Sequence, residues 1–129
     1  MVMNDILGSV ISQINNCEKS GKKTCTTRSS KLVIKVLALM KDNHYIGDFE
    51  KLLDGKSGLL TIRLLGSINK CSVIKPRYPF KKTAMEKFEK RYLPSKGFGI
   101  IIVSTSKGVM TLENAKALNL GGRLLSFVY

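Results

Sequence analysis

The chain opens with apolar residues at the spacing of one helix face, namely Ile6, Leu7, Val10, Ile11 and Ile14. Asn4 or Asp5 can cap the first turn of this helix, which we expect to end near residues 15–16. The polar, basic segment 19–23 is typical of a loop, and the β-branched residues of 24–27 predict a short strand.

A second helix is predicted over residues 31–41, with an N-cap at Ser29 or Ser30. Its apolar residues cover most of the helix circumference, which indicates burial on two sides. Three β-branched residues are also typical of a strand and leave that alternative open: Val33, Ile34 and Val36.

Two strands are predicted next, over 45–53 and 59–65, and the segment 54–58 between them has the Asp-Gly chemistry of a hairpin loop. The first half of the chain therefore has the order α-β-α-β-β. Prolines at both ends of 76–79 predict an extended or turning segment.

A short helix is predicted over 84–92, and its apolar face carries Met85, Phe88 and Tyr92. A strand follows at 98–105, with a run of branched apolar residues that indicates burial on both faces. The chain then turns at 106–108, and Thr111 can cap a helix over 112–118.

Gly121 and Gly122 are expected to end that helix, and 123–129 to form a last strand. One face of this strand should hold Leu125, Phe127 and Tyr129. The fold class is thus α+β. The length allows one domain or two small ones, and for two domains we place them at 1–68, an N-terminal α/β domain, and 69–129, a β-rich domain with short helices.

Charge narrows the choice of partner, because 22 Lys and Arg residues stand against 9 Asp and Glu, a net charge of +13. Such an excess favours a polyanion, with nucleic acid first and an anionic membrane surface second. The longest apolar runs fall far short of the roughly 20 residues that a membrane span needs. Residues 1–5 lack the features of a signal peptide, so we expect a cytosolic protein.

The residues that could ligate a metal are few and badly spaced: Cys17, Cys25, Cys71 and His44. We therefore expect reduced, buried or half-buried thiols, a surface or turn histidine, and neither a metal nor a cofactor. The segment 104–107 matches the S-x-x-K spacing of serine acyl enzymes, but the companion motifs S-D-N and K-T-G are absent. No catalytic residue is predicted.

Basic residues cluster in 19–35 and 70–107, where they can neutralise phosphates without reading sequence. Close contacts with a nucleic acid need hydroxyl groups and backbone that no side chain shields. The segment 104–108 supplies three hydroxyl groups from two serines and a threonine, a cation from its lysine, and exposed backbone at its glycine. The Gly-Gly-Arg segment 121–123 offers a close backbone approach for RNA beside a cation, and its glycines can also form a helix cap and turn; both roles can hold together. With few aromatic residues, structured RNA fits better than single strands. The alternative is a general basic interaction module that binds anionic membrane surfaces.

These residues resemble the universal small-subunit ribosomal protein eight family. The resemblance rests on the run from Ser104 to Met110, on Glu113 and Ala115, and on Gly121, Gly122 and Arg123. Matches elsewhere are Asn4, Asp5, Ile14, Asn15, Asn16, Ser30, Lys31, Lys75, Pro76 and Arg77. Phe88, Arg91, Leu93, Pro94, Phe98 and Gly99 resemble the archaeal and eukaryotic branch.

The resemblance implies a fold of two small packed α/β domains. It also implies a structural protein of the small ribosomal subunit that binds the central domain of its ribosomal RNA and contacts neighbouring ribosomal proteins, but no membrane. It implies RNA contacts by the first domain at Asn4, Asp5, Ser30 and Lys31, and in the middle of the chain at Lys75 and Arg77. In the second domain it implies contacts at Ser104, Thr105, Ser106, Lys107, Gly121, Gly122 and Arg123.

Overall fold

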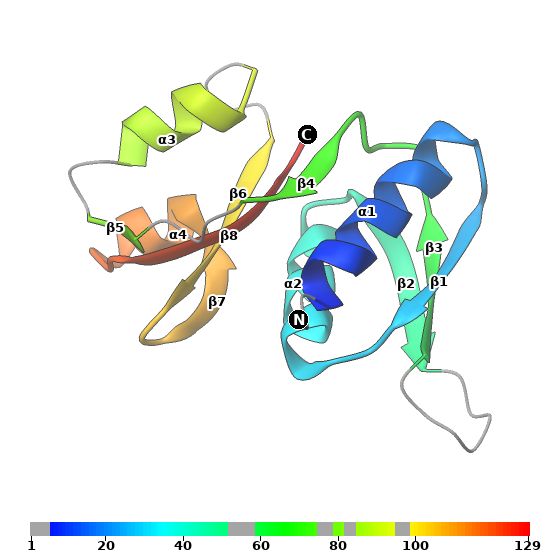
Figure 1. The fold of residues 1–129 in the computed structure, drawn as a ribbon. Helices are drawn as coiled ribbons and strands as arrows, with labels where there is room; N and C mark the ends of the chain where they lie inside the picture. Colours follow the sequence, from blue (N-terminus) through cyan, green and yellow to red (C-terminus); the bar gives the residue numbers. More distant parts are fainter. Residues whose placement is uncertain (1–5, 52–58, 75–78, 82–84, 95–98) are drawn as a thin grey trace, which may run out of the picture. The chain divides into compact units, whose positions relative to one another are not determined.

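The computed structural model describes residues 6–51, 59–74, 79–81, 85–94 and 99–129, and the chain divides into two units, Met1–Cys71 and Ser72–Tyr129 (Figure 1). Three expectations lie outside the described residues. They are the helix cap at Asn4 or Asp5, the hairpin loop at 54–58 and the extended piece after Pro76.

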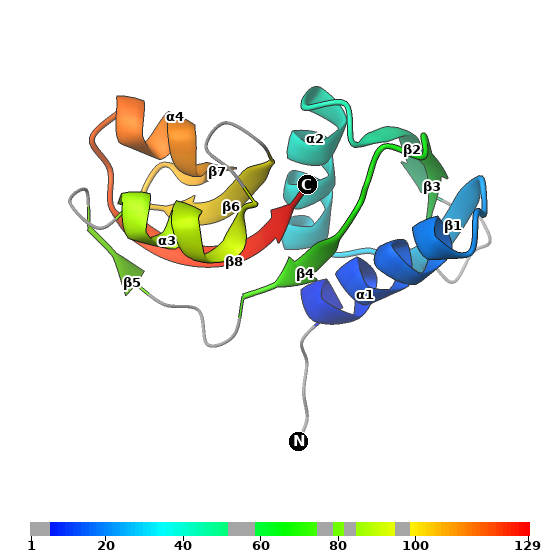
Figure 2. The same cartoon turned by 90° about the horizontal axis from the view of Figure 1, so that it is seen from above.

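The first unit has the predicted order of elements: α1 (Ile6–Lys19), β1 (Thr24–Arg28), α2 (Lys31–Asp42), β2 (Ile46–Lys51) and β3 (Leu59–Leu64). The strands form an antiparallel sheet in the order β1-β3-β2. Along β1, Cys25 and Thr27 are buried and alternate with exposed residues. Helix α1 packs against β1 and α2 against β2, so both helices cover this buried face (Figure 2). The alternative of a strand over 31–41 is therefore wrong, and Ser30 caps a helix there.

Helix α1 runs past its two consecutive asparagines, where we expected it to end, and continues to Lys19. Two of its polar side chains accept hydrogen bonds from distant backbone N–H groups. Asn15 Oδ1 accepts from Cys71 at 3.3 Å, and Glu18 Oε2 accepts from Ile68 at 2.9 Å. These tertiary bonds support a helical backbone where local propensity is low, which is why the predicted end is wrong.

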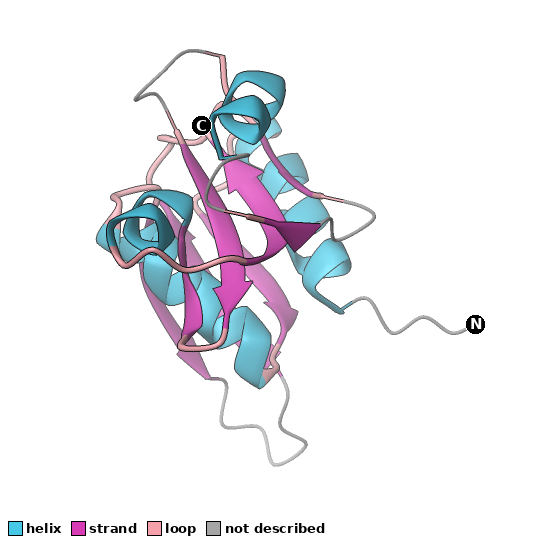
Figure 3. Ribbon diagram, turned by 90° about the vertical axis from the view of Figure 1, so that its left-hand side faces the viewer, coloured by secondary structure: helices cyan, strands magenta, loops and turns pink. Residues whose placement is uncertain are grey.

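The second unit contains β4 (Cys71–Val73), β5 (Pro79–Phe80), α3 (Met85–Tyr92), β6 (Ile100–Thr105), β7 (Gly108–Thr111), α4 (Leu112–Ala117) and β8 (Gly122–Val128). Its five-stranded sheet has the order β4-β8-β6-β7, and β5 pairs with the start of β8. The last strand is therefore central, although it is formed by the end of the chain. Figure 3 shows the strands in magenta and the helices in cyan.

One hydrophobic core lies between this sheet and the helices α3 and α4. Its buried members are Ile74, Phe80, Ile101, Val103, Leu112, Ala115, Leu124 and Phe127. The ring of Tyr92 on α3 lies 5.4 Å from that of Phe127, and the ring of Tyr129 stacks on Phe127 at 6.1 Å. The apolar side of α3 is thus used in packing.

A β-bulge makes the alternation of side chains along β8 differ from the predicted one. The register with β6 shifts between Ile102 and Val103, and the extra residue on β8 is Leu125. Leu124, rather than Leu125, therefore joins Phe127 on the core face. The expected alternation fails because the sequence carries no signal for the inserted residue.

Three helices end with a residue of positive φ: Gly21 at 74°, His44 at 65° and Asn119 at 57°. Each helix closes with the paired hydrogen bonds of a Schellman motif, as from Leu120 N–H to Ala115 O at 2.8 Å. His44 is exposed in this turn, so the expected surface or turn histidine is confirmed. Asn119 ends α4, and the prediction that Gly121 and Gly122 do so is wrong.

The glycine pair serves instead to bring strands together. Gly122 lies opposite Thr105 on one side and Phe80 on the other. A Cβ atom at Gly122 would overlap the carbonyl oxygen of Ser104, and one at Gly121 would lie 2.9 Å from the carbonyl oxygen of Phe80. The structure thus shows a close approach between protein strands at these two glycines, whereas the expected close approach of RNA to them stays a prediction.

The cysteines are free thiols, as expected, with Cys17 half-buried and Cys25 and Cys71 buried. The Cys71 thiol donates a hydrogen bond to Ile11 O of α1 at 3.5 Å. Burial, aided by the nearby Glu18 carboxylate, raises the pKa of Cys71 to about 12. This thiol therefore stays protonated in the folded chain above the pH at which an exposed thiol ionises.

We expect Gly122→Ala to lower the free energy of unfolding by about 1–3 kcal/mol, because the added methyl group would force two backbones apart. The control is Gly47→Ala, also in a strand, where the nearest atoms are 3.3 Å away and belong to side chains. Urea unfolding followed by circular dichroism compares the two. Equal losses would contradict the close packing at Gly122.

Because the pKa of Cys71 is raised, the free energy of unfolding should change with pH in the alkaline range. An unfolded thiol loses its proton near pH 9 and the folded one only near 12, so this contribution is complete below pH 9 and declines above it. The advantage of the native chain over Cys71→Ala should therefore be about 1 kcal/mol smaller at pH 10 than at pH 7. Urea unfolding at both values measures this, and a constant advantage would contradict it.

Candidate nucleic-acid interface

The strands β6 and β7 form a tight hairpin at one end of the second unit's sheet. Thr105 pairs with Gly108, so the connecting turn consists of Ser106 and Lys107 alone (Figure 1). Gly108 has a φ of 117°, a conformation that L-residues rarely adopt. The glycine predicted in this segment thus closes the turn and leaves Ser106 and Lys107 at its exposed tip.

The hydroxyl of Thr105 is used inside the hairpin. Its Oγ1 donates to Gly108 O at 2.9 Å and accepts from Lys107 N–H at 3.2 Å. A threonine has one hydroxyl proton, so this donor is already engaged. Thr105 therefore holds the shape of the turn, while the hydroxyls of Ser104 and Ser106 form no side-chain hydrogen bond within the described residues.

Strand β8 adds a cation beside the hairpin. Ser104 of β6 lies opposite Arg123, and Thr105 lies opposite Gly122. Residues paired in this way have Cβ atoms about 5 Å apart and present their side chains on the same face. The structure thus gathers seven predicted residues, which we call the hairpin end: Ser104, Thr105, Ser106, Lys107, Gly121, Gly122 and Arg123.

The hairpin end is basic and open to solvent. Ser106, Lys107 and Arg123 are exposed and Ser104 is half-buried. Lys107 and Arg123 have no ion-pair partner among the residues that the structure describes, and no residue of the hairpin end is acidic. Two free cations therefore stand beside two serine hydroxyls that can still donate, a combination suited to phosphate oxygens.

One residue next to the hairpin end was not among the site residues predicted from the sequence. Lys81 is exposed, and its Cα lies 3.9 Å from where a Cβ of Gly121 would be. The sequence places Lys81 in a basic stretch but cannot show that Phe80 pairs with Gly122. That pairing, made possible by glycine, is what brings Lys81 here.

The remaining predicted contacts lie elsewhere. Ser30 caps α2 in the first unit, where its Oγ accepts from Val33 N–H at 3.2 Å, and Lys31 is exposed beside it. The other four lie outside the described residues: Asn4, Asp5, Lys75 and Arg77. The structure therefore brings together the predicted contacts of the second unit, and those of the first stay predictions.

Other kinds of site have little support in this chain. Within the described ranges, no three His, Cys, Asp or Glu side chains come close enough together to hold a metal ion. None of the helices described is long and apolar enough to cross a membrane.

Two comparisons with known proteins show what this chain is similar to. A sequence model of the family "Ribosomal protein S8" matches residues 5–129. The "Small ribosomal subunit protein uS8" of the archaeon Methanococcoides burtonii is 51% identical over 130 residues, which cover 100% of both chains. That relative is archaeal, in agreement with the branch expected from 88–99. With matches over nearly all of its length, the chain belongs to the ribosomal protein S8 family.

Proposed function

We propose that this chain is a non-enzymatic, structural protein of the small ribosomal subunit in the cytoplasm. It binds the central domain of the small-subunit ribosomal RNA, and thereby supports subunit assembly and translation. Neighbouring small-subunit proteins are its other partners. The observation that carries the proposal is the pairing of Ser104 with Arg123 beside the exposed turn Ser106–Lys107.

The contacts divide into two kinds. Lys107 and Arg123 attract phosphates, and this attraction is insensitive to base sequence. The Ser106 hydroxyl sits at the tip of the turn, where it can donate to a phosphate oxygen or pair with a ribose 2′-hydroxyl. Because Thr105 fixes the turn internally, little conformational entropy is lost when these groups bind.

The first unit supplies further positive charge. Exposed cations cluster between the end of α1 and the middle of α2: Lys19, Lys22, Lys23, Arg28, Lys31 and Lys35. These cations enlarge the positively charged surface that attracts a polyanion. That attraction does not require a particular hydroxyl group or glycine beside them. We therefore assign them to affinity, and the hairpin end to recognition.

A general basic module on an anionic membrane surface is the weaker alternative. Such binding needs an exposed apolar face beside the charge. The amphipathic helix α3 would be the natural candidate, but Phe88 and Tyr92 pack against the core of the second unit. The apolar side of that helix is thus occupied.

We expect Ser106→Ala to weaken binding to a central-domain rRNA fragment by about 1–3 kcal/mol, because an RNA acceptor loses its donor. The substitution leaves the hydrogen bonds of Thr105 intact. Filter binding or fluorescence anisotropy at fixed salt measures the dissociation constant.

The matched control is Ser67→Ala, which removes an exposed hydroxyl from the first unit and should leave the affinity unchanged. Lys107→Gln should instead make the salt dependence less steep, by about the share of one phosphate contact. If Ser106→Ala binds as tightly as the native chain, the hairpin end is not the recognition element.

A further inference from the structure

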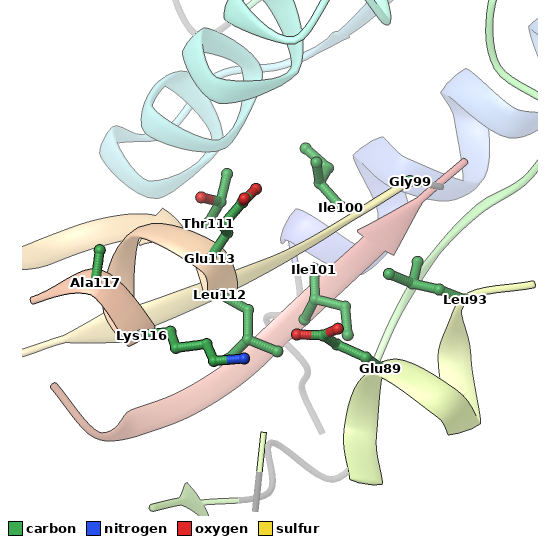
Figure 4. A pocket seen from close by; sticks show the side chains of 10 residues that line it. All are labelled: Glu89, Leu93, Gly99, Ile100, Ile101, Thr111, Leu112, Glu113, Lys116 and Ala117. Carbon is green, nitrogen blue, oxygen red and sulfur yellow. The ribbon is translucent and has the colours of Figure 1, made fainter. Parts of the chain in front are cut away.

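A groove of about 440 Å³ lies in the second unit between α3, β6 and α4 (Figure 4). Leu93, Ile101 and Leu112 form its apolar walls, and Glu89, Glu113 and Lys116 supply its charged groups. In Figure 4 the side chains of Glu89 and Lys116 extend toward the same space from the two helices. The groove is thus an apolar channel bordered by two carboxylates and one ammonium group.

The charge of this groove is opposite to that of the molecule. The whole chain carries +13, yet two of its nine acidic residues, Glu89 and Glu113, border this one groove. Neither forms an ion pair with any residue that the structure describes. A phosphate backbone would meet two carboxylates against one ammonium group, and an apolar floor, so this surface is unsuited to RNA.

Long cationic side chains fit such a groove well. Lysine and arginine can lay their apolar stems along Leu93, Ile101 and Leu112 while their charged heads reach Glu89 and Glu113. A guanidinium group is especially suited, because it pairs with a carboxylate through two parallel hydrogen bonds. An extended strand of protein that alternates cationic and apolar residues would satisfy both the walls and the carboxylates.

We infer that this groove, the α3–α4 groove, holds an extended, Arg- and Lys-rich segment of a neighbouring small-subunit protein. The inference rests on the proposed function, because the subunit provides such a neighbour. It assigns opposite partners to two surfaces of the second unit, with RNA at the hairpin end and protein at the α3–α4 groove.

Photo-cross-linking in small subunits reconstituted with the full chain tests this inference. Lys116, which is exposed at the groove, is replaced by p-benzoylphenylalanine, and Lys107 in the hairpin turn is replaced likewise in a second variant. We expect the probe at 116 to attach to an Arg- and Lys-rich peptide of another small-subunit protein, identified by mass spectrometry. The probe at 107 should attach to ribosomal RNA.

A double variant tests the role of the two carboxylates. Glu89→Gln combined with Glu113→Gln keeps the side-chain sizes but removes both charges, and should lower the cross-link yield from position 116 by about fivefold. Glu50→Gln, at an exposed position on β2, is the matched control and should change nothing. Subunit incorporation, measured by co-sedimentation, should be equal in all variants.

The outcomes separate the two proposals. A cross-link from 116 to RNA, to a second copy of this chain or to nothing overturns the assignment of the groove, while an RNA cross-link from 107 leaves the proposed function standing. The assignment of the groove is also overturned if the cross-link yield from position 116 stays the same when both carboxylates are removed. If the chain fails to enter subunits at all, it is the proposed function that fails.

Discussion

The contact on which the second unit depends is the approach of Gly122 to the carbonyl oxygen of Ser104. No other residue type fits there, since a Cβ atom would overlap that oxygen. With glycine in place, β8 pairs with β5 on one side and with β6 on the other. The pairing sets Arg123 opposite Ser104 and carries Lys81 to the same end of the sheet. The steric requirement of one residue thus creates the cluster of groups that we assign to RNA.

The net charge of the chain and the placement of individual side chains make separate contributions to the RNA binding that we propose. Its net charge of +13 explains attraction to a polyanion but not the choice of one, because exposed lysines and arginines occur in both units. We propose that selectivity comes from the serine hydroxyls of the hairpin turn, whose shape is held by the hydrogen bond from the Thr105 hydroxyl to the backbone. The carboxylates of the α3–α4 groove mark a place at which the basic character of the chain is reversed. A small protein can in this way face RNA and protein with different surfaces.

Much of the fold followed from periodicity and caps. The order of elements in the first unit, the cap at Ser30 and the cap at Thr111 could be predicted because they depend on neighbours in sequence, whereas the short strands β4 and β5 were not predicted. The length of α1, the bulge at Leu125 and the end of α4 could not, because each is decided by distant backbone or by a residue with positive φ. The turn and the Gly-Gly-Arg segment were both singled out from the sequence, whereas their adjacency came only from the register of β8 with β6. The division into domains at 1–68 and 69–129 and the individual RNA contacts stay predictions.

The central claim is that RNA meets this chain at the hairpin end. A nuclear magnetic resonance titration of the ¹⁵N-labelled full chain with a central-domain rRNA fragment tests it most directly. The account predicts that the largest amide shift changes of the second unit occur in 104–107 and 121–123, while Leu112 and Lys116 at the α3–α4 groove change little. Binding that shifts the groove amides most and leaves the hairpin end unperturbed would contradict it.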